Sequence, residues 1–489
     1  GGALKGTGTF GNVTTGQGGT FAPGNSIGQS NAASVTFEAG SVFEVELNDG
    51  GFVPGVNHDA IHVTGSATLI GGTVHVTPDN GTDTGETYLP GTYTILTADG
   101  GVSGAFDGVT DDYVFLDFAL DYDPSAVYLI SNRIAHFSDV ALTANQAGIA
   151  ATLDALDGGN DIVSALLGQT DEGAARHALD SLTGELHASL TATLVEQSRV
   201  TRDAAFARGN RISRREGVEL WIEGLAGNQR TDGTANTAAL KNNRYGFLLG
   251  ADTNIGSNLR VGAFAGYTDS DVRATDRGST ASLGSTHLGA YGAGQWGGFG
   301  LQVGADISWH DIDASRQVNF PGYSDSLESA YSARTGQLYG RMSYALSAGS
   351  VTFTPFGEIA HVWHSSERFA ETGGPAALDA EKVDTSVTFS TLGLRMGTEI
   401  DLGQSRAEFG AEIGWRHAFD QPEASVQALR AGGAPFAVAG APIAENALSL
   451  GLGGRLALSD RASLSFGYNA DLANQYENHA FRAGISFAF

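Results

Sequence analysis

The chain has 489 residues, a formal net charge of −27 at pH 7 and no cysteine. Its acidity excludes nucleic acid as a partner, because phosphates require a basic surface, and the lack of cysteine excludes disulfides, thiol nucleophiles and zinc–thiolate sites. The length predicts at least two domains, and 69 glycines against 11 prolines favour short strands and tight turns.

Residues 1–132 consist of short β-prone runs separated by glycine turns. Within them apolar and polar residues alternate, as where Val45 and Leu47 alternate with Glu44 and Glu46. The predicted strands lie at 34–47, 60–69, 72–76, 92–97, 113–120 and 126–130. Repeated short rungs predict a parallel β-solenoid, with a β-sandwich as the alternative.

Residues 141–210 change to a helical pattern, within a linker that we place at 133–212. Five leucines recur every three or four residues and therefore share one helix face. They are Leu179, Leu182, Leu186, Leu190 and Leu194. Gly184 predicts a break in this helix, because glycine has a low helix propensity.

Residues 213–489 return to a β pattern, in longer segments. Apolar and polar side chains alternate along them, as where Val303 and Ile307 alternate with Gln302 and Asp306. Twelve such segments lie at 217–227, 243–255, 259–270, 282–296, 299–313, 331–346, 351–365, 385–402, 405–419, 446–458, 462–472 and 479–489. An even number of antiparallel strands, each able to cross an apolar layer of roughly 25 Å, predicts a closed β-barrel of a bacterial outer membrane.

The connections between these segments alternate in length. Short turns are expected at 256–258, 297–298 and 348–350. Long polar loops are expected at 316–330, 368–384 and 420–445. This asymmetry is typical of short periplasmic turns and long extracellular loops, and a soluble sandwich offers no reason for it.

Membrane-spanning helices are not expected, since no stretch of about 18 apolar residues is present. The chain also does not begin with a methionine and an apolar signal segment. We therefore expect it to be the C-terminal portion of a longer secreted precursor.

The last residues form an aromatic motif. Arg482, Gly484, Phe487 and Phe489 follow the pattern polar, any, Gly, any, any, aromatic, any, aromatic, which resembles the C-terminal β-signal of outer-membrane barrels. Phe487 and Phe489 should face lipid, and Gly484 should allow close approach on the lumen side. We therefore predict that these four residues form an assembly signal.

Several motifs along the chain together resemble those of the monomeric type V autotransporters. GTFGNVT from Gly8 and GTFAPGNSIG from Gly19 are similar to the passenger-associated repeat, and PGTYTILTA from Pro90 to the junction region called the autochaperone. LTGELHASL from Leu182 is similar to the helical linker, and VELWIEG from Val218 to the first barrel strand. The resemblance implies a helix threaded through the barrel lumen and a passenger exported through the same barrel.

The resemblance also implies which residues line the pore. Arginines near the end of the lumenal helix are expected to pair with acidic residues of a polar barrel wall. The helix candidates are Arg199, Arg202, Arg208 and Arg211, and the wall candidates are Glu219, Glu223, Asp306, Glu358, Glu408 and Glu412. Leucines fit a polar lumen poorly, so we expect the leucine stripe to pack at the passenger junction instead.

The predicted function is that of an outer-membrane translocator that exports and anchors its passenger, with residues 1–132 at the cell surface. The alternatives are a passive porin-like channel or the membrane anchor of an upstream enzyme. The implied partners are outer-membrane lipid, the barrel-assembly machinery, periplasmic chaperones and the chain's own upstream passenger. We expect a monomer without cofactors.

No group of residues in the sequence predicts catalysis. Gly24, Ser26 and Gly28 match a Gly-x-Ser-x-Gly pattern but lack a following helix and a placed histidine and acid. His361 and His364 lie three residues apart in a strand pattern, so they should face opposite sides. We therefore predict no catalytic, cofactor-binding or metal site.

Overall fold

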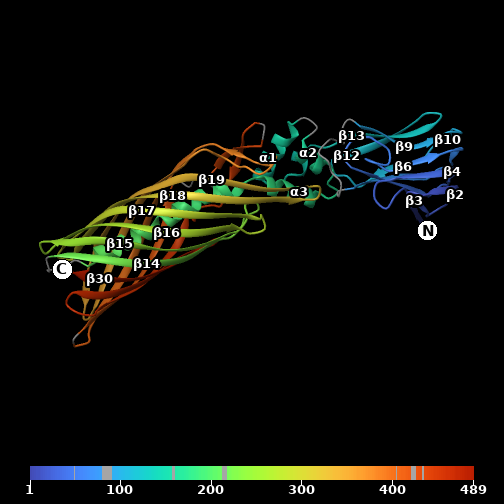
Figure 1. Ribbon diagram of the computed structural model, residues 1–489. Helices are drawn as coiled ribbons and strands as arrows, with labels where there is room; N and C mark the ends of the chain where they lie inside the picture. The colour runs from blue at the N-terminus through green and yellow to red at the C-terminus, as the bar shows by residue number, and fades with distance from the viewer. Residues whose placement is uncertain are drawn as a thin grey trace.

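The computed structural model describes residues 1–48, 50–79, 91–156, 160–211, 217–403, 405–419, 426–431 and 434–489. The molecule is elongated, with three parts in chain order (Figure 1). A small β-structure at the N-terminal end is followed by a group of helices and then by a large barrel, and a helix runs along the inside of the barrel. The predicted fold class, all-β with a helical linker, is confirmed.

The N-terminal part is a parallel β-solenoid. Its short strands pair in parallel, so that successive turns of the chain stack on one another. Parallel pairing excludes the alternative sandwich, whose sheets are antiparallel. One sheet contains β1 (Ala3–Lys5), β3 (Thr20–Ala22), β5 (Val42–Leu47), β8 (Thr73–Pro78) and β11 (Gly108–Asp111). The other contains β2 (Thr9–Thr15), β4 (Gln29–Phe37), β6 (Ala60–Val63), β7 (Ala67–Leu69), β9 (Gly91–Ala98) and β10 (Val102–Gly104).

Aromatic rings stack along the inside of the solenoid. The ring centroid of Phe37 lies 6.3 Å from that of Phe21, 5.5 Å from that of Phe43 and 5.1 Å from that of Phe106. These rings come from different strands and turns, so each contact joins segments that are distant in sequence. Such aromatic pairs add about 0.5–1.5 kcal/mol to the free energy of burial.

Two antiparallel strands end the solenoid. β13 (Ala126–Arg133) pairs antiparallel with β9 and with β12 (Leu116–Tyr122), which stops the parallel stacking. Phe115, just before β12, is fully buried, and its ring lies 4.9 Å from that of Phe137. The last turn of the solenoid is thereby joined to the helices that follow it.

The described residues between the solenoid and the barrel form four short helices. These are η1 (Phe137–Val140), α1 (Ala144–Asp154), α2 (Asp161–Leu167) and α3 (Glu172–Leu182). Their apolar side chains, such as Leu153, share one hydrophobic core with the solenoid and with Phe320 of the barrel. Gln169 donates a hydrogen bond to the carbonyl of Pro321 at 2.9 Å. We call this region the junction core.

The barrel wall consists of twelve long antiparallel strands within the described residues. They are β14 (Val218–Thr231), β15 (Leu240–Ile255), β16 (Leu259–Ala274), β17 (Ser279–Trp296), β18 (Phe299–Phe320), β19 (Tyr323–Tyr344), β21 (Val351–Ser366), β24 (Val383–Asp401), β25 (Arg406–Phe419), β28 (Asn446–Ala457), β29 (Ala462–Ala473) and β30 (Tyr476–Ala488). Each pairs with its neighbour along the chain, with the short β20 (Leu346–Ala348) as an extra segment on β21. β14 pairs with β30 and closes the wall.

The expected long loop at 316–330 is wrong. β18 and β19 continue through it as a hairpin that turns at Pro321 and Gly322, where Gly322 has a φ of 84°. The inward residues Val318 and Leu327 enter the junction core, so the hairpin has its own apolar face. The sequence of residues 316–330 is rich in polar residues because the outward side chains of this hairpin lie beyond the apolar belt of the barrel.

The other two expected loops contain short strands. β22 (Phe369–Ala370) and β23 (Asp379–Ala380) lie in the first, and β26 (Val426–Arg430) and β27 (Phe436–Ala439) lie in the second. Together they form a small sheet, which covers the end of the barrel near the junction core. Residues 420–425 and 432–433 of the second loop lie outside the described residues.

A carboxyl group, that of Asp59 just before β6, is buried in the solenoid. The two oxygens of Asp59 accept hydrogen bonds from the backbone N–H of Gly28 at 2.8 Å and of Glu46 at 3.0 Å. Burial nevertheless raises the pKa of the Asp59 carboxyl to about 8, because removal from water penalises the charged form. Burial also raises the pKa of Glu46.

This burial predicts that the solenoid loses stability as the pH rises. A carboxyl group whose pKa is higher in the folded state than its unfolded value of 3.8 stabilises the fold fully below about pH 4. That contribution is lost between about pH 4 and pH 8, on the order of 1 kcal/mol per pH unit. Hydrogen–deuterium exchange of the β5 and β6 peptides should therefore be faster at pH 8 than at pH 5, after correction for intrinsic rates.

Asp59→Asn should reduce this pH dependence, because the amide does not titrate. Peptides from the barrel strands serve as the internal control. Equal pH dependence in the variant and the original chain would contradict the assignment to Asp59.

Candidate functional site: the barrel lumen and its helix

The barrel lumen contains two consecutive helices. α4 (Glu185–Gln197) begins after Gly184, whose φ of 67° separates it from α3, and α5 (Arg199–Gly209) follows Ser198. Both run inside the barrel, from the mouth near the solenoid toward the opposite mouth, where the C-terminus lies (Figure 1). We call these the proximal and distal mouths. The predicted helix break at Gly184 is confirmed.

The proximal half of the lumen has an apolar region beside α4. Leu186, Leu190 and Leu194 of α4 are buried against inward side chains of several barrel strands. The main wall residues are Leu240, Val272, Leu283 and Ile312. On another side of the helix, Ala192 and Val195 contact Val362, Val387 and Phe389. Together these side chains form an apolar collar, and such a dry constriction opposes the passage of water and ions.

The leucine stripe therefore does not lie where we expected. Leu179 and Leu182 of α3 belong to the junction core, but Leu186, Leu190 and Leu194 lie inside the barrel. The expectation failed because it assumed a lumen that is polar along its whole length. The inward wall residues that face these three leucines are apolar, although Arg416 of the wall contacts Glu196 of the same helix.

Three histidines of neighbouring strands line the wall next to the collar. His310 lies 2.8 Å from the hydroxyl of Ser285 and 3.0 Å from that of Thr335, and the Thr335 hydroxyl also lies 3.0 Å from His364. His287 has similar hydroxyl neighbours. Because hydroxyl groups can donate and accept, these buried rings are satisfied in their neutral form.

The arginines of α5 contact carboxylates of the barrel wall. Arg202 lies 3.0 Å from Glu358 and donates to the amide oxygen of Gln337 at 2.6 Å. Arg208 makes two parallel hydrogen bonds to Asp252, at 2.8 and 2.9 Å. Paired charges of this geometry fix both the height and the rotation of a helix, since the planar guanidinium accepts few orientations.

The other two predicted arginines also have acidic neighbours. Arg199 lies 2.5 Å from Asp471 and 3.2 Å from Asp203 of the same helix. Arg211, at the end of the described helix region, lies 3.9 Å from Glu219. The ion pairs made by arginines within α5 are therefore short, whereas the pair made by Arg211, which follows α5, is longer.

The predicted wall acids fall into two groups. Glu219 and Glu358 contact helix arginines directly. The others pair within the wall: Glu223 with Arg482 at 3.9 Å, Glu412 with Arg341 at 3.1 Å, Glu408 with Arg455 at 3.3 Å and Asp306 with the Gln337 amide at 2.9 Å. Pairing between wall residues was not anticipated from the sequence.

Several residues that hold the helix were not predicted. Asp252 and Asp471 are the direct partners of two helix arginines, and Arg416 binds Glu196 of α4 through two contacts, at 2.5 and 3.1 Å. Strand alternation places Arg416 on the inner face. It cannot identify a partner 220 residues away in the sequence.

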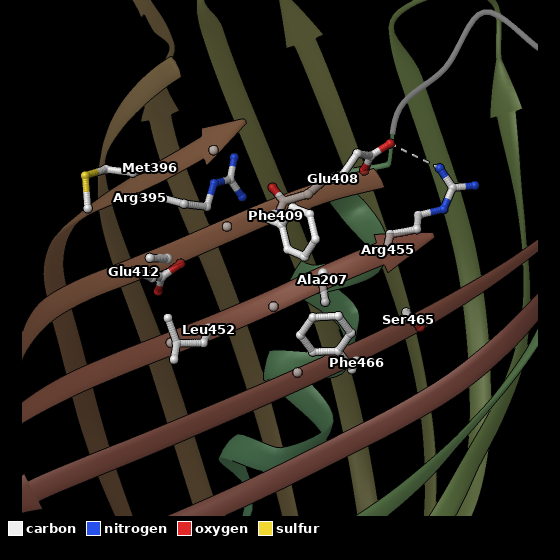
Figure 2. Close-up of a pocket in the computed structure, with 18 of the residues that line it drawn as sticks. Ala207, Arg395, Met396, Glu408, Phe409, Glu412, Leu452, Arg455, Ser465 and Phe466 are labelled. Carbon is white, nitrogen blue, oxygen red and sulfur yellow. Dashed lines mark hydrogen bonds and ion pairs between the residues drawn. The ribbon is translucent and has the colours of Figure 1, made fainter. Parts of the chain in front are cut away.

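The lumen beside the last turns of α5 contains a cavity of about 450 Å³. Figure 2 shows Arg395, Glu412 and the ion pair of Glu408 with Arg455 around Ala207 of α5. Charges of both signs line this space. The distal half of the lumen therefore contains open space lined by charged groups, whereas side chains pack around α4 in the proximal half.

The C-terminal motif lies at the closing strand. Arg482 and Gly484 point to the lumen side, and Phe487 points outward. A Cβ at Gly484 would lie only 2.7 Å from the carbonyl oxygen of Ile222, so a side chain would disturb the contact between β30 and β14. Phe489 follows β30, and its N–H donates to the carbonyl of Val218 at 3.0 Å.

The residues considered for catalysis do not come together. Ser26 donates a hydrogen bond to Asp79 at 2.7 Å in a solenoid turn. His361 is exposed on the outside of β21, whereas His364 is buried inside the barrel. Among the described residues, no group of three or more His, Cys, Asp or Glu side chains could hold a metal ion. No helix in the described part of the chain is both long and apolar enough to cross a bilayer.

A closed antiparallel barrel with an apolar outer surface, whose charged interior holds a helix of the same chain, defines an outer-membrane translocator barrel. The family model of the autotransporter beta-domain matches residues 220–469, and the chain belongs to the autotransporter family. The protein is accordingly located in the bacterial outer membrane. The barrel itself is not an enzyme.

The chain is similar to two extracellular serine proteases of Serratia marcescens. The first is 30% identical over 547 aligned positions, which cover 100% of this chain and 52% of the relative. The second is 28% identical, with 93% and 48% covered. The chain thus spans about half the length of these relatives.

Among solved structures, the translocator domain of autotransporter NalP from Neisseria meningitidis is similar to this chain. The match has a TM-score of 0.50 at 16% sequence identity and covers 61% of this chain and 98% of that chain. It shows that the two proteins share a fold.

The buried pair of Arg416 and Glu196 predicts how the helix can be loosened. Arg416→Met would leave Glu196 without its counter-charge, and breaking a buried pair typically costs about 3–5 kcal/mol. We expect the variant to show higher and noisier ionic conductance in planar bilayers than the original chain. The double variant Arg416→Met with Glu196→Met should regain much of the closed state, because it buries no unpaired charge.

Arg406→Met is the matched control, since Arg406 pairs with Glu399 at the exposed distal rim. Conductance of Arg416→Met no higher than that of the original chain would show that the pair does not hold the helix in place.

Proposed function

We propose that residues 213–489 are the translocator through which the preceding chain reaches the cell surface, and that residues 133–212 are the linker that then closes the pore. The observation that carries this proposal is the path of the chain. α5 ends in the distal half of the lumen, and β14 begins at the distal mouth, so everything before α4 lies beyond the proximal mouth (Figure 1). The proximal mouth is then extracellular and the distal mouth periplasmic.

Residues 1–132 are proposed to be the C-terminal folding core of the passenger. Each solenoid turn offers a free parallel edge to the turn before it in sequence, so folding outside the cell can proceed rung by rung. Folded rungs cannot return through a lumen that one helix fills. Folding would therefore bias movement of the chain outward.

The passenger upstream of this chain is proposed to be an enzyme. Both relatives named above are extracellular serine proteases, and about half of each relative lies outside the matched region. The barrel would then serve as its exporter and anchor. A porin-like channel is disfavoured by the apolar collar around α4.

We further propose that the barrel functions as a monomer surrounded by outer-membrane lipid. Before insertion it would be handled by periplasmic chaperones and the barrel-assembly machinery. The motif of Arg482, Gly484, Phe487 and Phe489 would serve as the recognition signal. Its support is the exposed position of Phe487 and Phe489 at the seam between β30 and β14.

Phe115→Asp tests the folding core. Phe115 is fully buried where the solenoid meets the helices, so a carboxylate there would destabilise the last turn by several kcal/mol. Surface display of the full precursor, measured with an antibody on intact cells, should fall at least about tenfold while the barrel still inserts. Ile70→Asp is the matched control, because Ile70 is 64% exposed in the same solenoid.

If Phe115→Asp were displayed as well as the original chain, residues 1–132 would not drive export. Heat-modifiable migration on gels confirms for each variant that the barrel has folded.

The double variant Phe487→Ser with Phe489→Ser tests the assembly signal. It removes both aromatic rings and places hydroxyl groups toward lipid, so the amount of barrel in outer-membrane fractions should fall sharply. Phe409→Ser with Phe419→Ser is the matched control, as both rings are outward on β25. Similar losses for the two double variants would mean that general lipid contact, rather than a signal, explains the effect.

A further inference from the structure

A groove lies on the lipid-facing surface of the barrel, over β14, β15, β29 and β30. Its volume is about 950 Å³. Small outward residues, Gly224, Ala226 and Ala483, leave the space, and the exposed rings of Phe247 and Phe481 border it. An acyl chain is the kind of molecule that such an apolar, membrane-facing groove accommodates.

Polarity rises along these strands toward the extracellular mouth. The outward positions of β15 are, in this order, Phe247, Tyr245, Asn243 and Lys241. Those of β14 are Gly224, Ala226, Asn228 and Arg230. Asn228 donates a hydrogen bond to the side-chain oxygen of Asn243 at 2.7 Å. From Phe247 to Lys241 the strand advances roughly 20 Å, which at the usual tilt of such strands is roughly 15 Å along the membrane normal.

Three cations lie side by side above the groove. Arg230 is directly opposite Lys241, and Lys241 is directly opposite Arg273, on three adjacent strands. All three side chains are exposed on the outer face. Like charges directly opposite one another in a sheet are destabilising, so folding alone does not account for this row.

The surrounding protein neutralises this row only in part. Arg230 has two acidic neighbours, Asp232 at 3.1 Å and Glu477 directly opposite it on β30, but no carboxylate of a described residue lies within 4.0 Å of Lys241 or Arg273. The chain has only three lysines and a net charge of −27, so two adjacent cations without an ion pair, Lys241 and Arg273, are unusual for it. Its natural counter-charge would come from outside the protein.

We propose that this surface binds a lipid with a phosphate-bearing headgroup in the outer leaflet of the membrane. The acyl chain occupies the groove, the Tyr245 and Asn243 region accepts the polar linkage, and the phosphate lies on Arg230, Lys241 and Arg273. The proposal rests on the outer-membrane location of the barrel and is independent of passenger export. Basic residues at the membrane surface are a recognised means of binding anionic lipid headgroups.

The test uses the purified full chain and native mass spectrometry to measure retained lipid. Dioleoyl phosphatidic acid, dioleoyl phosphatidylcholine and inorganic phosphate are offered separately and in competition. We expect the chain to retain phosphatidic acid in preference to phosphatidylcholine. The double variant Lys241→Gln with Arg273→Gln should bind it about 25-fold more weakly, since each basic residue near an anionic lipid contributes a factor of about five.

A second variant tests the groove with the cations intact. Ala226→Trp fills the groove and should abolish retention of phosphatidic acid. The controls are Arg334→Gln, which removes an exposed outward cation on β19, and Ala263→Trp, which adds bulk at an outward position of β16 outside the groove. Both controls should retain the lipid, and heat-modifiable migration confirms that each barrel is folded.

Three results would overturn the proposal. One is equal retention of the two lipids by the original chain. Another is a loss in Arg334→Gln or Ala263→Trp as large as that in the corresponding test variant. The third is full competition by inorganic phosphate, which would indicate a simple anion site rather than a lipid site.

Discussion

The closed hydrogen-bonded wall is the constraint on which the rest of the structure depends. In lipid an unpaired backbone group costs several kcal/mol, so β14 must pair with β30 along its length, from Glu219 opposite Ala488 to Thr231 opposite Tyr476. The number of strands then sets the width of the lumen. A wall of this size holds one helix, whose diameter with side chains is about 10–12 Å. Closure of the wall does not determine which contacts that helix makes with the wall.

The lumen meets its helix in two physically different ways. The apolar collar around Leu190 and Leu194 excludes water but has little directional preference, because dispersion and burial tolerate small rotations. The ion pairs of Arg202 and Arg208 are directional and leave a costly buried charge when misplaced. The collar thus seals the pore, and the arginines set the position of the seal. A wholly apolar lumen would close without a defined register, and a wholly ionic one would admit water.

Local patterns in the sequence predicted most of the helices and strands but few of the side-chain contacts between them. Alternation located all twelve strands and the inner face that carries Arg416, because a strand's period of two is a local property. It could not pair Arg416 with Glu196, since that contact depends on the height at which the helix stops in the barrel. The loop expected at 316–330 was wrong because polarity was taken as a sign of irregular structure, although Val318 and Leu327 alternate with polar residues. The leucine stripe was misplaced because nothing local reveals that the facing wall is apolar.

The junction core gives the surface domain a second mechanical connection to the membrane. The chain itself is one connection, through α4 and α5. The other is lateral: Phe115, Leu153 and Phe320 belong to one hydrophobic core, and Arg316 of β18 donates to the carbonyl of Ser181 at 3.0 Å. A pull on the solenoid is therefore shared between the helix and the β18–β19 hairpin. Because that hairpin continues into the barrel wall, much of the load bypasses the helix, and the seal is shielded from tension.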